Sequence, residues 1–283
     1  MTLEQDTLAL LARAAAHRRP PRVRALHLPP APAPAPGADA PGSSWCALEL
    51  ADASLGLAYL GSGGSPAALR RSAGGLAGAD PLALAEGLRA PAAAADGATR
   101  ALGFAAVHAL SNWLWRAAGW APPAAHDSMG GLVPRPGEKI GMIGLFGSLV
   151  PRLAAGGARL VVVELRPELH GLRDGALVTG ERAELADCTQ VLATATLVSN
   201  GSFEAMRAAC RAARRFVLVG PSAGILPDAL FARGVTALGG TWIEDPTAFL
   251  ASLVQGTRRG ASARKFALGA ADYPGTPALI ARL

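Results

Sequence analysis

The second half of the chain alternates short apolar runs with longer segments that are able to form helices. Runs of Val and Leu without polar alternation are typical of parallel strands buried on both faces, and the segments between them supply the crossover helices that such strands need. We therefore predict a doubly wound parallel α/β sheet of five or six strands over residues 138–270. The predicted strands are residues 140–146, 159–165, 190–195, 215–220, 235–240 and 265–268.

Residues 43–120 follow a different order, with strands first and helices after them. The apolar runs at 45–50 and 55–60 predict an antiparallel hairpin, and residues 99–118 predict a long apolar helix. This order is typical of a smaller α+β domain. A stretch rich in Pro and Gly, residues 121–137, is the predicted linker between the two domains.

The two ends of the chain are predicted to lie outside these domains. Residues 3–16 have the apolar spacing of a short helix, and residues 29–42 form a Pro/Ala spacer that we expect to be extended and unpacked. Residues 1–42 are therefore predicted to be an N-terminal helix and linker, so that the folded body begins near Trp45. Residues 271–283 are predicted to be a C-terminal tail.

The charge distribution bears on the partners of the chain. There are 27 Lys and Arg against 21 Asp and Glu, which gives a net charge of +6. The excess lies at the two ends, because residues 43–250 hold equal numbers of basic and acidic residues. Nucleic-acid binding requires a stripe of Lys and Arg interleaved with aromatic residues, and the sequence shows none. We therefore expect no nucleic-acid partner.

Targeting and membrane signals are weak. Glu4 and Asp6 precede the first apolar stretch and Arg18 and Arg19 follow it, which is the reverse of a secretory signal. No uncharged apolar run is long enough to span a bilayer, so we expect no membrane partner. The cysteines lie far apart without a CxxC motif, which excludes a disulfide or zinc framework. These features predict a cytoplasmic protein with free thiols.

Ligands of doubly wound sheets bind outside the carboxyl ends of the strands, so the first two predicted strand ends are candidate sites. Gly144, Gly147 and Ser148 follow the first strand, where their backbone N–H groups could hold an anionic group; glycines needed only for strand–helix packing are the alternative. The GxGxxG dinucleotide fingerprint is absent. Glu164 ends the second strand at the spacing of a ribose-binding acid, or it forms an ion pair with Arg166.

The next two strand ends are also polar. Thr196 and Asn200 belong to a run of hydroxyl and amide side chains after the third strand, where a ligand contact or a plain helix cap by Asn200 or Ser202 would explain them. Gly220 and Ser222 form a Gly/Ser loop after the fourth strand, which could present N–H donors or simply make a turn. All four predicted ligand contacts would lie at one edge of the sheet.

The sequence lacks the residue spacings that are typical of metal-binding and nucleophile motifs. The histidines form no HxH, HxxxH or HExxH pattern, and there is no GxSxG nucleophile elbow. His126 in the linker and His170 after the second strand are the candidate metal ligands, with solvated loop residues as the alternative. His108, on the apolar helix, is predicted to be a core histidine. The cysteines are predicted to be packing residues: Cys46, Cys188 and Cys210.

Four segments carry a resemblance to a known family: IGMIGLFGSLVPRL, VVVELRPE, TLVSNG and VLVGPSAGILPDALFARGV, in that order. Together they resemble a bacterial and archaeal family of unknown function for which a role in heavy-metal chelation is suggested. The resemblance covers residues 45–268. It implies a small domain like the enolase N-terminal domain, followed by a Rossmann-like domain, with a binding cleft between them. It also implies a role in metal, metallophore or corrinoid metabolism.

The leading hypothesis is a protein that binds a small anionic or metal-chelating ligand in the cleft between the two domains, through the residues named above. Its cofactor would be a divalent metal or a nucleotide-type ligand. One alternative is an enzyme that uses NAD(P) or S-adenosylmethionine, although no general acid or base is evident. Another is a non-catalytic interaction protein whose N-terminal helix docks on a partner or on a second subunit, as in a homodimer.

Overall fold

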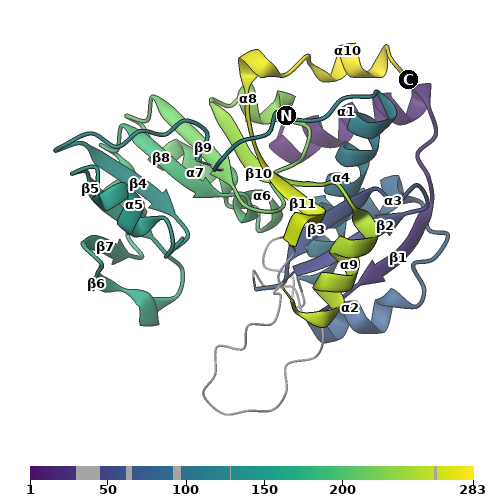
Figure 1. Cartoon of the computed structure of the whole chain (residues 1–283), viewed down its shortest axis with the longest axis horizontal. Coiled ribbons are helices and arrows are strands. Elements are labelled where there is room, and N and C mark those ends of the chain that lie inside the picture. The colour runs from purple at the N-terminus through teal and green to yellow at the C-terminus, as the bar shows by residue number, and fades with distance from the viewer. Residues whose placement is uncertain (30–44, 62–65, 92–96, 128, 258–259) are drawn as a thin grey trace.

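The computed structural model describes residues 1–29, 45–61, 66–91, 97–127, 129–257 and 260–283. Its strands form two sheets: a small antiparallel sheet in the order β1-β2-β3, and an eight-stranded sheet in the order β11-β10-β9-β8-β4-β5-β7-β6 (Figure 1). The strands are β1 (Val23–His27), β2 (Trp45–Leu50), β3 (Leu55–Tyr59), β4 (Lys139–Ile143), β5 (Arg159–Val163), β6 (Gly171–Arg173), β7 (Ala176–Thr179), β8 (Gln190–Thr194), β9 (Arg215–Val219), β10 (Ala237–Ile243) and β11 (Ala263–Gly269).

The large sheet confirms the predicted α/β class. Strands β4, β5, β7, β8, β9 and β10 are parallel, and each predicted apolar run forms a strand. From β4 the chain adds β5 and β7 on one side, and then returns to add β8, β9 and β10 on the other. The order therefore reverses between β4 and β8, which is where doubly wound sheets bind their ligands.

The last strand differs from the expected pattern, because β11 pairs antiparallel to β10 over its whole length. Helix α9 (Pro246–Gln255) connects these two strands. Its Phe249 and Leu253 pack with Leu55 and Leu57 of the small sheet. The helix thus packs onto the first domain rather than making a crossover, and the chain returns beside β10 in the opposite direction.

A β-hairpin at the far edge raises the sheet above the five or six strands that we expected. Strands β6 and β7 are antiparallel neighbours, with Arg173 opposite Ala176. The two residues between them, Asp174 and Gly175, have φ of 48° and 82°. Positive φ at both positions is typical of the two-residue hairpin turn for which Asp-Gly is a favoured sequence.

The hairpin and the long apolar helix that we predicted in the first domain are both present. Strands β2 and β3 form the antiparallel hairpin, and α4 (Ala98–Ala117) is the long apolar helix that packs on it. Gly56 on β3 allows this close approach, because a Cβ there would lie 1.9 Å from the carbonyl oxygen of Ala105 on α4. Shorter helices are α2 (Pro66–Ala73), α3 (Pro81–Ala85) and the 3-10 helix η1 (Glu86–Arg89).

The expectation that the folded body begins near Trp45 is wrong. Strand β1 pairs with β2 as an integral part of the small sheet. The predicted helix is present as α1 (Leu3–His17), and it buries Leu3, Leu8 and Leu11 within the chain. Its apolar face is therefore not free to dock on a partner. The predicted Pro/Ala spacer, residues 29–42, lies outside the described residues from residue 30 onwards.

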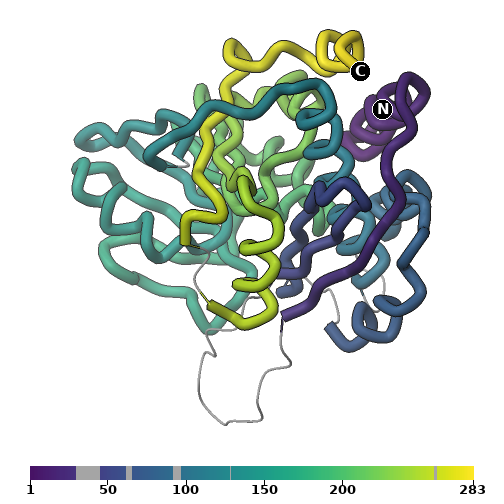
Figure 2. The backbone as a smooth tube through the Cα atoms, turned by 45° about the vertical axis from the view of Figure 1, so that its right-hand side comes forward, coloured from purple at the N-terminus to yellow at the C-terminus, as the bar shows by residue number. Residues whose placement is uncertain are grey.

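The C-terminal residues are not a free tail either. Helix α10 (Thr276–Ile280) buries Leu279 and Ile280 and contacts both α1 and α4, so that the two ends of the chain lie close together (Figure 2). Asp228 on the large-sheet side accepts hydrogen bonds from the N–H and hydroxyl of Thr276. The segment is held in place because its polar groups are paired and its apolar groups are buried.

One apolar core joins both parts of the chain, since side chains of α1, α4 and the small sheet pack with those of β8, β9 and β10. Among the helices of the described residues, none combines the length and apolar character that crossing a bilayer requires. The remaining helices are α5 (Val150–Ala154), α6 (Thr196–Ser199), α7 (Phe203–Ala209), α8 (Asp228–Phe231) and the 3-10 helices η2 (Pro167–Leu169), η3 (Arg182–Leu185), η4 (Gly260–Ser262) and η5 (Ala270–Asp272).

Candidate functional site

The predicted strand ends form a row at the carboxyl edge of the large sheet. A Cβ on Gly144, after β4, would lie 3.1 Å from the Thr194 side chain at the end of β8. A Cβ on Gly220, after β9, would lie 3.7 Å from Cβ of Ala195. The structure therefore brings the first, third and fourth predicted tips together around the point where the strand order reverses.

Glu164 joins this row from β5. Its carboxylate accepts hydrogen bonds from the N–H of Leu145 at 3.0 Å and from the N–H and Nε of Arg166 at 3.1 and 3.2 Å. Burial alone would raise the pKa of Glu164, but these hydrogen bonds outweigh it and leave that pKa below its ordinary value. Of the two alternatives, the ion pair with Arg166 is present; contact of Glu164 with a ligand stays a prediction.

The loop between β4 and α5 offers some of its N–H groups and uses others internally. Gly144 donates to the carbonyl of Val163 in the neighbouring strand, so its N–H is not available to a ligand. Gly147 and Ser148 are exposed, and no acceptor for their N–H groups is recorded among the described residues. Two of the three predicted loop residues therefore present donors to the outside.

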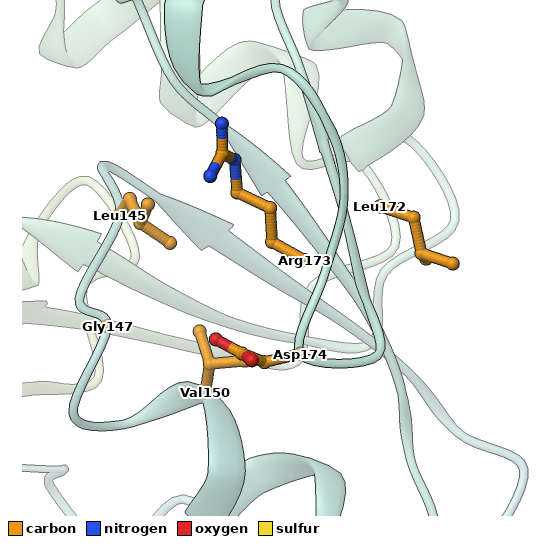
Figure 3. Close-up of a pocket in the computed structure, with 6 residues that line it drawn as sticks. All are labelled: Leu145, Gly147, Val150, Leu172, Arg173 and Asp174. Atoms are coloured by element: carbon orange, nitrogen blue, oxygen red, sulfur yellow. The ribbon is translucent and has the colours of Figure 1, made fainter.

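A pocket of about 430 Å³ opens beside this loop (Figure 3). One wall is the β4–α5 loop, and the other is the β6–β7 hairpin. In Figure 3 the Asp174 carboxylate lies beside Val150 at the start of α5, and the Leu172 side chain points away from the loop. The lining residues are Leu145, Gly147, Val150, Leu172, Arg173 and Asp174.

Sequence reasoning missed the hairpin wall of this pocket. The Asp174-Gly175 pair between two short apolar stretches is the signal that could have revealed it. Arg173 in this wall is held by two backbone carbonyls, because its Nε donates to Leu169 at 2.6 Å and its Nη2 to Glu168 at 2.9 Å. The guanidinium is thus fixed by the backbone of η2 rather than by an acidic side chain.

The polar run after β8 is partly used for local structure. Asn200 accepts hydrogen bonds from the N–H and the hydroxyl of Ser202 at 3.0 and 2.6 Å, which fixes the turn before α7. Ser202 occupies the N-cap of α7 without a side-chain capping bond. The hydroxyls of Thr194 and Thr196 lie 2.9 Å apart and are half-buried. Thr196 and Asn200 are thus both half-buried, with a side-chain oxygen engaged in local structure.

The Gly220–Gly224 loop is covered by helix α4 of the first domain. Beyond it, the N–H of Leu226 donates to the Ser111 hydroxyl on α4, and Asn112 on α4 donates to the carbonyl of Gly224. Ser222 is completely buried, and its hydroxyl has no hydrogen-bond partner among the described residues. At this loop the first domain is in direct contact with the sheet edge, so Ser222 cannot reach a ligand without movement.

The predicted metal ligands are not brought into a cluster. His126 is an exposed residue of the linker, and the Nε2 of His170 lies 2.9 Å from the carbonyl oxygen of Glu164. Across the parts of the chain that the structure describes, no three His, Cys, Asp or Glu side chains converge on one point. The described residues therefore do not fit a cation that is held by protein side chains alone.

The predicted packing residues are confirmed. His108 is buried, and its Nδ1 accepts a hydrogen bond from the N–H of Leu57 at 2.8 Å; burial lowers the pKa of His108 to about 4. The three cysteines are buried and free. Burial raises the pKa of the thiols to about 12, about 11 and about 12 for Cys46, Cys188 and Cys210.

Comparison with known proteins decides the family. Residues 131–270 match the model of the DUF364 family, which is described as "Putative heavy-metal chelation". This part of the chain belongs to the DUF364 family. The resemblance stated from the sequence is thereby confirmed. No curated protein matches the chain.

Two solved structures share the fold of this DUF364 chain. A DUF364 protein of unknown function from Desulfitobacterium hafniense DCB-2 is 19% identical, with a TM-score of 0.65; the match covers 94% of this chain and 98% of that one. A second, from Pyrococcus horikoshii, is 18% identical, with a TM-score of 0.61 and the same coverage. At these identities the likeness shows the fold alone, over 94% of this chain.

Proposed function

We propose that this DUF364 protein binds a small anionic ligand, namely a metal ion carried in an organic chelate, at the carboxyl edge of the large sheet. The observation that carries the proposal is a pocket of about 430 Å³ lined by Gly147, where the exposed residues Gly147 and Ser148 have N–H groups without a recorded acceptor among the described residues. One wall of the pocket, the β4–α5 loop, follows the strand at which the strand order reverses, which is where doubly wound folds bind ligands; the other wall is the hairpin at the β6 edge of the sheet.

The donor set argues for the class of ligand. The pocket has one acidic lining residue, Asp174, beside Arg173 and the loop N–H groups. The backbone N–H groups and the Arg173 guanidinium can only donate hydrogen bonds, and they therefore suit the carboxylate or phosphate oxygens of an anion, while Asp174 faces the cationic part of a metal chelate. A chelate held through such oxygens needs no metal-binding side chain from the protein, because its organic part supplies the metal ligands. The family description, which names heavy-metal chelation, supports the metal as cargo.

Isothermal titration with defined probes tests the proposal. The probes are the 1:1 Ni²⁺–citrate complex, Ni²⁺ alone, citrate alone, inorganic phosphate, NAD⁺ and S-adenosylmethionine. We expect saturable binding of Ni²⁺–citrate, which at 100 times its dissociation constant adds about 2.7 kcal/mol to the free energy of unfolding. Binding of Ni²⁺ alone and not of the complex would contradict the proposal. Binding of NAD⁺ or S-adenosylmethionine alone would favour the enzyme alternative instead.

A pair of glycine variants locates the site. A Cβ on Gly147 or on Gly74 would meet nothing within 4 Å, and neither glycine has positive φ, so that a larger side chain is tolerated at both positions. We expect Gly147→Trp to fill the mouth of the pocket and abolish binding of Ni²⁺–citrate without loss of stability. Gly74→Trp, in the first domain, is the matched control and should bind like the unmodified protein. Unchanged binding by Gly147→Trp would show that the ligand lies elsewhere.

A further inference from the structure

Arg166 is a cation at the end of β5 that is only partly used by the fold. Its guanidinium donates from Nε to one Glu164 oxygen at 3.2 Å and from Nη2 to the other at 3.4 Å. These two atoms form the side edge of the guanidinium. The end edge, formed by Nη1 and the second hydrogen of Nη2, has no acceptor recorded among the described residues.

This free edge faces solvent. The Arg166 side chain is 57% exposed, whereas that of its partner Glu164 is 10% exposed. Glu164 therefore acts as a fixed support, and the outer part of the arginine extends beyond it. The hydrogen bonds that Arg166 donates to Glu164 also raise the pKa of Arg166, so that the guanidinium stays charged.

Arg166 does not itself line the pocket, but the Glu164 carboxylate links it to a residue that does. Oε2 of Glu164 accepts from the N–H of Leu145, which lines the pocket, and also from Nη2 of Arg166. The Glu164 carboxylate thus bridges the Arg166 guanidinium and the backbone of the β4–α5 loop. Tyr59 at the end of β3 lies within electrostatic range of Arg166, which places this cation where the first domain approaches the sheet edge.

We propose that Arg166 recognises the anionic group of the ligand through its free end edge, with Glu164 as the residue that positions it. This inference rests on the proposed function, since it adds Arg166 to the loop N–H groups and Arg173 as a donor to the ligand's carboxylate or phosphate oxygens. Two parallel N–H donors match two oxygens of a carboxylate or phosphate, a geometry that lysine cannot reproduce.

Titration of Ni²⁺–citrate into four proteins tests the assignment. They are the unmodified protein, Arg166→Gln, Arg166→Lys and the matched control Arg159→Gln. Arg159 begins the same strand and is also exposed, but it lies at the opposite edge of the sheet. Loss of a charge-assisted contact predicts at least about tenfold weaker binding for Arg166→Gln. Arg166→Lys keeps the charge but loses the paired donors, so we expect at least about fivefold weaker binding. The control should stay within about twofold.

The outcomes separate this inference from the proposed function. If the unmodified protein binds the complex but Arg166→Gln binds within about twofold of it, the role of Arg166 is refuted while the site stands. If Arg166→Lys restores full affinity, a single positive charge is sufficient and paired recognition is refuted. If the unmodified protein binds no anionic probe, the proposed function fails, and the role of Arg166 with it. Should Arg166→Gln not fold, as judged by circular dichroism, the lysine variant decides alone.

Discussion

Replacement of Arg100 by Met tests whether the N-terminal helix is part of the folded body. Arg100 lies on α4, is 6% exposed, and links α1, η1 and α6 to its own helix. Met keeps most of the side-chain volume and removes the charge with its donors. The acceptors left without a partner are the carbonyl oxygens of Leu88, Ala90, Val198 and Ser199 and the carboxylate of Glu4.

The size of the effect follows from burial. Removal of one partner from a buried ion pair costs about 3–5 kcal/mol. The Glu4 side chain is 20% exposed, so water relieves part of the loss on that side, but the carbonyl oxygens each lose a donor worth about 1 kcal/mol. We expect a net loss of about 3–5 kcal/mol in the free energy of unfolding for Arg100→Met, or roughly 6–15 °C in Tm.

Urea unfolding followed by tryptophan fluorescence measures this loss. The control is Arg89→Met, because the Arg89–Glu86 pair has both side chains more than half exposed, and such pairs contribute about 0–1 kcal/mol. A loss below about 1 kcal/mol for Arg100→Met would refute the reasoning, since α1 and α6 would then be held without this residue.

Three other predictions concern local packing. Burial lowers the pKa of His108 from 6.5 to about 4. The contribution of neutral His108 to the free energy of unfolding is therefore complete above pH 6.5 and is lost as the pH falls towards 4, by about 1.4 kcal/mol per pH unit. The urea midpoints at pH 7.5 and pH 5 should differ less in His108→Asn than in the unmodified protein. Gly56→Ala should lower the free energy of unfolding by more than about 3 kcal/mol or prevent folding, because its Cβ would meet backbone atoms at 1.9 and 2.3 Å. Gly74→Ala has open space around its Cβ and should be neutral, so equal Tm values for the two variants would contradict this prediction. Buried thiols with raised pKa should not react with a disulfide reagent at pH 8 until the protein is unfolded; rapid labelling of the native protein would show that they are accessible.

The class of the large sheet was predictable because continuous Val and Leu runs directly report strands buried on both faces. The neighbours of each strand were not predictable, since such runs carry no signal about pairing order. The antiparallel direction of β11 depends on where α9 packs, a tertiary contact between Phe249 and the small sheet. The β6–β7 hairpin had a local signal in Asp174-Gly175, but its strands are too short for periodicity to show.

The ends of the chain show how one feature can mislead. The Pro-rich stretch at 29–42 suggested that everything before it was an arm. Yet residues 22–28, between two pairs of prolines, alternate polar and apolar side chains except at Ala25–Leu26, which is close to the pattern of the strand found at Val23–His27. The side-chain pattern of residues 22–28 thus predicts β1, whereas the Pro-rich composition of the stretch that follows wrongly suggested an unpacked arm.

The candidate site was predictable in place but not in detail. The carboxyl edge followed from the fold class alone, and Gly147, Ser148 and Glu164 all lie there. Whether a polar group is free depends on its partners, which sequence spacing does not report. The N–H of Gly144 is used by the sheet, and Ser222 is buried.

Anomalous diffraction at the nickel edge, from crystals soaked in Ni²⁺–citrate, tests the central claim most directly. The account predicts a nickel peak in the pocket beside Gly147, with citrate oxygens bonded to the loop N–H groups and to Arg166 and no protein side chain coordinating the metal. A peak coordinated by histidine or cysteine side chains elsewhere, or no peak in the pocket, would contradict it.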